Sequence, residues 1–256
     1  MSDSAARLGE IYLHRGNLLK AQNSYRQAVQ EAREHGSPEE LSHALGNLGN
    51  VYALLEDYEA AERLYQEVLD IQRSQQTENA IGTTLVNLGN LQADAGRPEQ
   101  ALAYYLEAID LLTPLGNEQA LGILYTNLAL QELLLDQSKH AISHFQLALD
   151  YHRKVGNEDG LATTYGQLGK AYLLTGHVKK AEACLNNASE HFIKLANKPG
   201  EAGALRLLVN IYQTRNDTTS ALRCIEQVIQ IDQHYSLPQY EDDLQLYHQL
   251  RESLTK

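Results

Sequence analysis

The chain has 256 residues, of which 43% are hydrophobic and 21% charged, so it can bury a core and is not a disordered chain. Its net charge of −12 argues against a general nucleic-acid or anionic-membrane binder, because both need a positive surface. With only two cysteines the chain has no disulfide framework, and no apolar stretch reaches the ~20 residues of a membrane span. The N-terminal residues lack the apolar segment of a signal peptide, so the sequence favours a cytoplasmic protein.

The dominant feature of the sequence is an internal repeat with a period of 40 residues, which recurs six times without insertion or deletion. One column holds only leucine: Leu8, Leu48, Leu88, Leu128, Leu168 and Leu208. A second holds only alanine: Ala21, Ala61, Ala101, Ala141, Ala181 and Ala221. A third is large and apolar: Tyr25, Tyr65, Tyr105, Phe145, Leu185 and Ile225.

Each copy is predicted to contain two helices. In the second copy, apolar residues recur at i, i+3 and i+4 on both sides of Asp57, which favours helices from Pro38 to Leu54 and from Tyr58 to Gln75. We call the first helix of each copy helix A and the second helix B. Small residues such as Gly49 should let the two helices approach closely. Large residues such as Tyr65 should fill the space between neighbouring copies.

One hairpin cannot bury both of its faces, whereas a stack of six can, so the sequence predicts an all-α solenoid. The copies are expected at residues 1–36, 37–76, 77–116, 117–156, 157–196 and 197–236. Residues 237–256 leave the repeat and predict a capping helix that covers the sixth copy. Pro238 would lie in its first turn, and its apolar face would consist of Leu237, Tyr240, Leu244, Tyr247, Leu250 and Leu254. The alternative is an interaction helix, with the acidic run at 241–243 facing a partner.

The residues of one copy resemble a known family. Leu48-Gly49-x-x-Tyr52, followed by Asp57, Ala61 and an aromatic residue, is similar to the tetratricopeptide repeat (TPR), and the match covers residues 5 to about 235. The long period and the strings GNLGN (46–50) and VNLGN (86–90) resemble the LGN/Pins and kinesin-light-chain subclass. This resemblance implies a right-handed superhelix whose A helices line a concave face that binds peptides.

Carried over by position, the resemblance predicts a peptide-binding stripe on that concave face. The stripe consists of Asn47, Asn50, Asn87, Asn90, Asn127, Leu130, Lys170, Arg206 and Asn210. Asparagine amides offer both donors and an acceptor to a peptide backbone. The cations Lys170 and Arg206 are expected to anchor a carboxylate. The alternative is that these asparagines cap or bridge neighbouring A helices and bind no ligand.

Signals of catalysis are weak. There is no phosphate-binding loop or nucleophile elbow, and the pair His140 and His144 occurs in the string HAISH, which lacks the glutamate of a zinc-protease motif. We therefore interpret these histidines as packing or surface residues. Cys184 and Cys224 occupy equivalent places on adjacent B helices, where the expected separation exceeds that of a relaxed disulfide. No metal and no cofactor are expected.

The sequence thus predicts a non-enzymatic protein–protein interaction scaffold that binds a peptide segment of a partner in the concave TPR groove. It is unlike a TPR clamp for chaperone C-termini, because residues such as Ala6 and Glu10 replace the basic residues which that clamp needs. Two alternatives stay open. One is a regulatory or sensory module of a larger signalling protein, and the other is a scaffold that forms a homo-oligomer through its uncapped N-terminal end.

Overall fold

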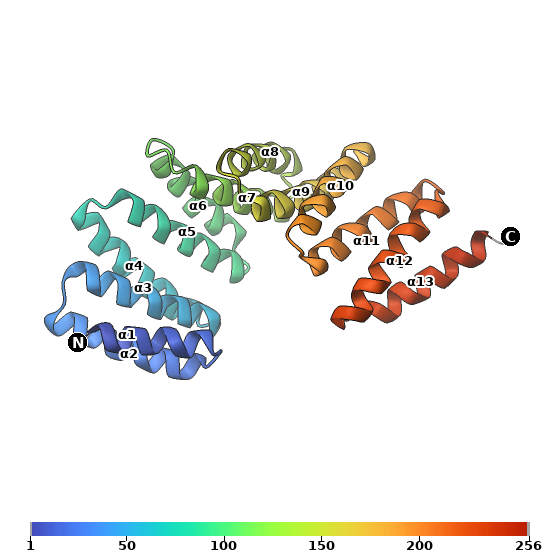
Figure 1. Cartoon of the computed structure of the whole chain (residues 1–256). Coiled ribbons are helices and arrows are strands. Elements are labelled where there is room, and N and C mark those ends of the chain that lie inside the picture. The colour runs from blue at the N-terminus through green and yellow to red at the C-terminus, as the bar shows by residue number, and fades with distance from the viewer. Residues whose placement is uncertain (1, 255–256) are drawn as a thin grey trace. The chain divides into compact units, whose positions relative to one another are not determined.

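The computed structural model describes residues 2–254, and within that range it contains thirteen α-helices and no strand. The all-α fold is confirmed. Met1, expected in the first copy, and Thr255 and Lys256, expected in the last helix, lie outside the described residues. The helices of Figure 1 are α1 (Ser2–His14), α2 (Leu18–His35), α3 (Pro38–Leu54), α4 (Tyr58–Gln75), α5 (Glu78–Asp94), α6 (Pro98–Leu112), α7 (Glu118–Leu134), α8 (Ser138–Val155), α9 (Glu158–Leu174), α10 (Val178–Lys194), α11 (Lys198–Thr214), α12 (Thr218–Tyr235) and α13 (Tyr240–Leu254).

The first compact unit ends at Asn117 and contains α1 to α6. It consists of three antiparallel hairpins, α1/α2, α3/α4 and α5/α6, in which α2 packs against α3 and α4 packs against α5. The bounds of α3 and α4 coincide with the two helices expected from the spacing in the second copy. The capping box between Ser37 and Glu40 explains where α3 begins, because each side chain accepts a hydrogen bond from the other residue's backbone N–H.

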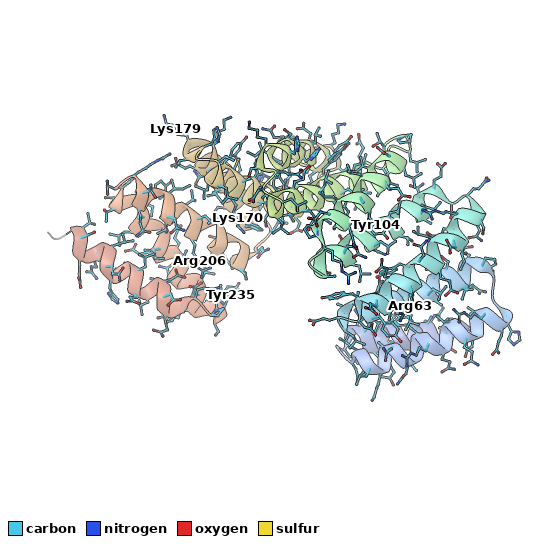
Figure 2. All side chains as sticks on the ribbon, turned by 180° about the vertical axis from the view of Figure 1, so that it is seen from behind. Arg63, Tyr104, Lys170, Lys179, Arg206 and Tyr235 are labelled. Carbon is cyan, nitrogen blue, oxygen red and sulfur yellow. The ribbon has the colours of Figure 1, made fainter. Side chains whose placement is uncertain are left out.

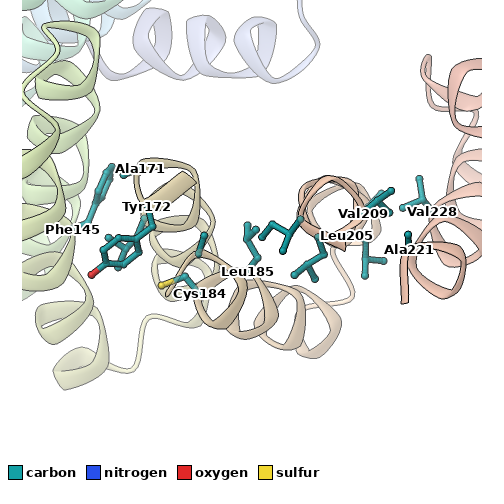
Figure 3. Packing of buried hydrophobic residues seen from close by; sticks show 14 of the residues in the cluster. Phe145, Ala171, Tyr172, Cys184, Leu185, Leu205, Val209, Ala221 and Val228 are labelled. Carbon is teal, nitrogen blue, oxygen red and sulfur yellow. The ribbon is translucent and has the colours of Figure 1, made fainter. Parts of the chain in front are cut away.

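The second compact unit begins at Glu118 and contains α7 to α13. Three further hairpins, α7/α8, α9/α10 and α11/α12, stack in the same way, and α13 packs against α12. Its core runs through all three hairpins, where Phe145, Leu185 and Val228 have no exposed surface (Figure 3). Because each hairpin buries its apolar faces only against its neighbours, the stack is held by nearest-neighbour contacts.

The A helices of each unit lie closer to one another than the B helices do. In the first unit α1 contacts α3, and in the second α7 contacts α9 and α9 contacts α11, whereas successive B helices of the described chain show no comparable packing. We therefore assign the A helices to the inner face of each unit. This is the face on which the sequence places the predicted binding stripe.

Glycine and tyrosine set the close approach of the two helices of a hairpin. A β-carbon added to Gly49 would lie 2.8 Å from Cε1 of Tyr65, so the ring occupies the place that a side chain would need. The close approach expected at Gly49 is confirmed. The space that Tyr65 fills is inside its own hairpin, whereas the sequence analysis placed it between copies.

The turns of the repeat use a left-handed residue at two recurring places. Between helices A and B, Gly16, Gly96 and Gly176 have φ values of 70° to 75°. The same place is taken by Glu56, Asp136 and Asn216 in the other copies. After helix B, Gly116 and Gly156 are left-handed, and Gln76, Ala196 and Ser236 adopt the same conformation.

The C-terminal helix differs in one respect from the expectation. Leu237 and Pro238 precede α13, which begins at Tyr240, so proline lies outside its first turn. Leu250 is buried, and Leu237 and Tyr247 pack against the core of the second unit, whereas Leu254 is 55% exposed. No helix of the described residues combines the length and the apolar character that a membrane span requires.

Candidate functional site

The inner face of the first unit carries an elongated groove. Helices α3, α4 and α5 bound a depression of about 820 Å³. A second depression of about 310 Å³ lies beside it and is lined by residues of α1, α2 and α3. The two share Glu39, His43 and Asn47, so they form one continuous groove, which we call the first-unit groove.

Three of the predicted asparagines meet in this groove. Asn47 and Asn50 of α3 lie one helical turn apart, and Asn87 projects from α5 in the next hairpin. Asn47 and Asn87 are partly exposed, and their side chains have no hydrogen-bond partner among the described residues. Their amides can therefore donate to and accept from a bound segment without breaking an internal contact.

Asn50 and Asn90 have a second role inside their own hairpins. The hydroxyl of Tyr65 donates to Oδ1 of Asn50 at 2.6 Å, and Tyr105 donates to Oδ1 of Asn90 at 2.7 Å. Burial raises the pKa of Tyr65 to about 12, so this hydroxyl stays protonated and keeps its donor. The carbonyl of Asn50 is thus engaged, and its Nδ2 group still offers donors to the groove.

A network of polar side chains forms one wall of the first-unit groove. Gln72 of α4 donates from Nε2 to Oγ of Ser42 at 3.4 Å and accepts at Oε1 from the hydroxyl of Thr84 at 2.9 Å. All three side chains are buried or nearly so. Gly46 lies beside them on α3, and a β-carbon added there would meet nothing within 4 Å. The groove is therefore open at Gly46 and supported by a fixed wall.

The other predicted stripe residues of the inner face do not line this groove. Asn127 is partly exposed on α7, and Leu130 packs against the core of the second unit. Lys170 of α9, labelled in Figure 2, and Asn210 of α11 are exposed. Lys170 forms no ion pair with any described residue. The structure brings together Asn47, Asn50 and Asn87, and it places these others elsewhere.

Arg206 is engaged by carboxylates of the protein itself. From α11 its Nη2 donates to Oδ1 of Asp232 at 2.6 Å, and its Nε donates to Oδ2 of Asp243 at 2.7 Å. Asp232 lies on α12 and is fully buried, and Asp243 lies on α13 and is 7% exposed. Burial raises the pKa of Asp243, although the hydrogen bond from Arg206 lowers it. The guanidinium thus ties α13 to the last hairpin.

Of the histidines and cysteines singled out in the sequence, His144 has an internal partner and Cys184 is buried. His144 contacts Oε2 of Glu132 through Nδ1 at 2.8 Å and stacks on the ring of Tyr125. His140 is exposed. Burial raises the pKa of the Cys184 thiol to about 11, which makes its reactive thiolate rare at neutral pH.

Sequence reasoning missed the residues that shape the groove. Gly46 and Gln72 were not singled out, because a glycine presents no side chain and a glutamine on helix B has no obvious link to the inner face. The pairing of Asn50 with Tyr65 had a visible signal. Asparagine occurs with tyrosine fifteen residues later in two successive copies, at 50/65 and 90/105.

Comparison with known proteins places the chain among repeat proteins. The family model described as Tetratricopeptide repeat matches residues 2–74, 41–113, 80–154, 120–194 and 160–234. No curated protein matches the sequence.

Three similar solved structures share the fold at low identity. BtubC (BKLC) from P. vanneervenii has a TM-score of 0.78 and 20% identity over 86% of this chain and 92% of its own. The signal transduction ATPase (STAND) protein PH0952 from Pyrococcus horikoshii, which has a tetratricopeptide repeat sensor, has a TM-score of 0.86 and 18% identity over 97% of this chain and 38% of its own. A Rap protein complexed with Competence and Sporulation Factor has a TM-score of 0.66 and 14% identity over 98% of this chain and 75% of its own.

Proposed function

Because the chain belongs to the tetratricopeptide repeat family, we propose that it is a non-enzymatic protein–protein interaction scaffold that binds an extended peptide segment of a partner in the first-unit groove. Repeats of this family are generally protein–protein interaction modules. The proposal adds where the peptide binds, that it binds in an extended form, and that asparagine amides pair with its backbone.

The observation that carries the proposal is the pair of uncommitted amides. Asn47 and Asn87 face one groove from neighbouring hairpins, and neither has an internal hydrogen-bond partner in the described chain. An extended segment presents N–H and C=O groups along its length, so two amides set along a groove can pair with its backbone. Asn50 lines the same groove and adds Nδ2 donors. The elongated shape favours an extended segment over a compact small molecule.

The similar structures support a binding role at the level of the fold. A tetratricopeptide array forms the sensor of the STAND protein, and the Rap protein is complexed with Competence and Sporulation Factor. A sensory role in a larger signalling protein is consistent with the same groove. The free cysteines Cys184 and Cys224 fit a reducing compartment, and we propose a cytoplasmic location.

The second-unit stripe residues stay predictions. Lys170 and Asn210 are exposed and would contact a partner on that unit, and Asn127 and Leu130 are predicted to bind the same peptide. Asn90 of α5, in the first unit, also stays a predicted peptide-binding residue. Arg206 is left out of the proposed site, because its Nε and Nη2 donate to Asp243 and Asp232 and its charge is already paired.

The experiment selects phage-displayed random 12-residue peptides on the full chain and measures their affinities for two glycine variants. Gly46→Phe places a ring in the groove, and its β-carbon would meet no atom within 4 Å, so the fold should persist. Gly166→Phe is the control, since Gly166 holds the same register position in the second unit, and a β-carbon added there would meet only Cβ of Ala188, at 4.0 Å. We expect selected peptides to lose at least tenfold in affinity, about 1.4 kcal/mol, to Gly46→Phe and to keep their affinity for Gly166→Phe.

Equal binding to both glycine variants, or a failure of the selection, would contradict the proposal. The double variant Asn47→Ala with Asn87→Ala should weaken the same peptides. It is a cleaner change than replacing Asn50 and Asn90, which would also remove the acceptors of Tyr65 and Tyr105.

A second candidate function rests on α1. Leu8 is 44% exposed and Ile11 47% exposed, whereas the equivalents of Leu8 in the other copies are buried. Self-association through this face would cover both side chains. Sedimentation equilibrium of the full chain and of a Leu8→Glu variant tests it, and a monomeric wild-type chain at high concentration would exclude it.

A further inference from the structure

The first-unit groove is acidic where its two depressions meet. Among the described residues that line its two depressions, those with a formal charge at pH 7 are Glu39 and Glu40. Glu40 is engaged in the capping box, where it accepts from the backbone N–H of Ser37 at 2.8 Å. Glu39 lies in the first turn of α3 and has no hydrogen bond or ion pair with any described residue. Its carboxylate is therefore available to a ligand at the point where the two depressions meet.

The preceding hairpin carries a further carboxylate, outside the two depressions. Glu10 of α1 has the register position of Asn50, and its charge is one cause that raises the pKa of Tyr25, after burial. Tyr25 is the equivalent of Tyr65, so Glu10 faces the tyrosine of its own hairpin as Asn50 does. Glu10 lies near His14 and lines neither depression, so it adds negative charge to the first unit at a different register position from Glu39.

The sixth copy shows what kind of group fits the open position at Gly46. Arg206 has the register position of Gly46, and Asp232 has that of Gln72. In the sixth copy the guanidinium of Arg206 donates to Asp232 of helix B, so a side chain of the protein itself occupies the space beside helix B. In the second copy Gly46 leaves the equivalent space empty, with the carbonyl of Gln72 and the hydroxyl of Ser42 in its wall.

These observations converge on one chemistry. We infer that the first-unit groove takes an extended segment carrying a lysine or arginine, whose cation lies at Gly46 beside the Gln72 wall and pairs with Glu39. The inference rests on the proposed function and names its partner class. A cation would complement a groove that contributes acceptors and negative charge, in a chain whose net charge is −12.

The test uses the peptides that bind the wild-type chain and lose affinity to Gly46→Phe. We expect lysine or arginine to be enriched in them over the unselected library. Glu39→Lys should weaken them about tenfold or more. Glu59→Lys is the matched control, because Glu59 is the second residue of α4, as Glu39 is of α3, and does not line the groove. Both variants change the net charge equally, so long-range attraction is held constant, and the control should change affinity less than twofold.

Replacing the cation of the peptide by glutamine should remove most of the difference between Glu39→Lys and wild type, which identifies the contacting pair. Peptides that respond to Gly46→Phe but show no enrichment in cations, or respond alike to Glu39→Lys and Glu59→Lys, would overturn this inference and leave the proposed function standing. The absence of peptides sensitive to Gly46→Phe would overturn both.

Discussion

The hydroxyl of Tyr65 lies 2.6 Å from Oδ1 of Asn50, so the residue that seals the hairpin α3/α4 also orients an amide on the inner face. The same ring covers Gly49 and is 3% exposed. Packing inside the hairpin and the chemistry of the groove therefore meet in one side chain.

Removing this hydroxyl should weaken the fold modestly. Tyr65→Phe keeps the ring over Gly49 and loses one hydrogen bond, so we expect the free energy of unfolding to fall by about 0.5–1.5 kcal/mol in urea. Tyr104→Phe is the control, because the hydroxyl of Tyr104 has no hydrogen-bond partner among the described residues. An equal effect of the two changes would show that the bond to Asn50 contributes nothing.

Tyr65 also predicts a response to alkaline pH. Burial raises its pKa in the folded chain from 10.0 to about 12, so the folded state disfavours the tyrosinate. Its stabilising contribution is complete below pH 10 and is lost as pH rises towards 12. The urea midpoint of wild type should fall more steeply across this range than that of Tyr65→Phe, and parallel curves would contradict the assignment.

The leucine column should carry much of the stability of each stack. Leu128 of α7 is 1% exposed, so Leu128→Ala should cost about 2–5 kcal/mol, the cost of lost apolar burial and of the cavity left behind. Leu134→Ala on the same helix, where the side chain is 70% exposed, should change stability by less than about 0.5 kcal/mol. An unchanged urea midpoint for Leu128→Ala would contradict this account.

A buried histidine predicts a loss of stability in mild acid. His152 is 1% exposed, and its ring nitrogens lie 3.3 Å from the hydroxyl of Thr126 and 3.2 Å from Nδ2 of Asn157. Burial lowers its pKa below 6.5, against the charge of Asp159, so the folded chain holds it neutral. The contribution of neutral His152 to the free energy of unfolding is complete above pH 6.5 and is lost as pH falls through the lowered pKa.

The variant His152→Leu isolates this effect, because Leu112 holds the same register position and is buried there. Between pH 7.5 and 5, the urea midpoint of wild type should fall more than that of the variant. Identical slopes would show that another group titrates.

Arg206 should hold the last helix in place. Arg206→Met leaves Asp232 and Asp243 buried without their cation, so we expect a loss of about 3–5 kcal/mol in urea and faster hydrogen exchange in α13. Arg215→Met is the control, because its pair with Glu182 is more exposed and should contribute about 0–1 kcal/mol.

The carboxyl of Asp243 predicts the opposite pH response to His152. Its pKa is raised in the folded chain, so its contribution is complete below its unfolded pKa of 3.8 and is lost as pH rises through the folded value. Asp243→Asn should remove that loss and retain an acceptor for Nε of Arg206. Hydrogen exchange of α13 at pH 7 should be slower in this variant than in wild type, and faster exchange would show that the negative charge is needed.

The fold was predictable because every copy repeats the same apolar columns. Leu48 and Ala61 recur at each step of 40 residues, and their spacing fixes both helices of a hairpin, including the bounds of α3 and α4. Helix periodicity is a local property, so one copy suffices to read it. Three of the predicted amides also meet in one groove, because residues one repeat apart on A helices share a face.

The contacts that individual side chains make with distant residues were not predictable in the same way. Whether Arg206 faces solvent depends on where α13 lies, and α13 is outside the repeat, so no column relates Asp243 to the arginine 37 residues earlier. The space at Gly46 results from an absent side chain and from the Gln72 network behind it. Both features depend on three-dimensional neighbours that the spacing does not encode.

The turns leave the chain room for greater heat resistance. Glu56 and Ala196 hold a left-handed conformation that glycine provides in other copies, at φ values of 61° and 52°. Such a conformation costs an ordinary residue roughly 1–2 kcal/mol. Glycine avoids this cost, but it loses more conformational entropy on folding, which offsets part of the gain. Replacing both by glycine should therefore raise the melting temperature while leaving core and groove untouched. Thermal stability could then be changed without changing peptide binding.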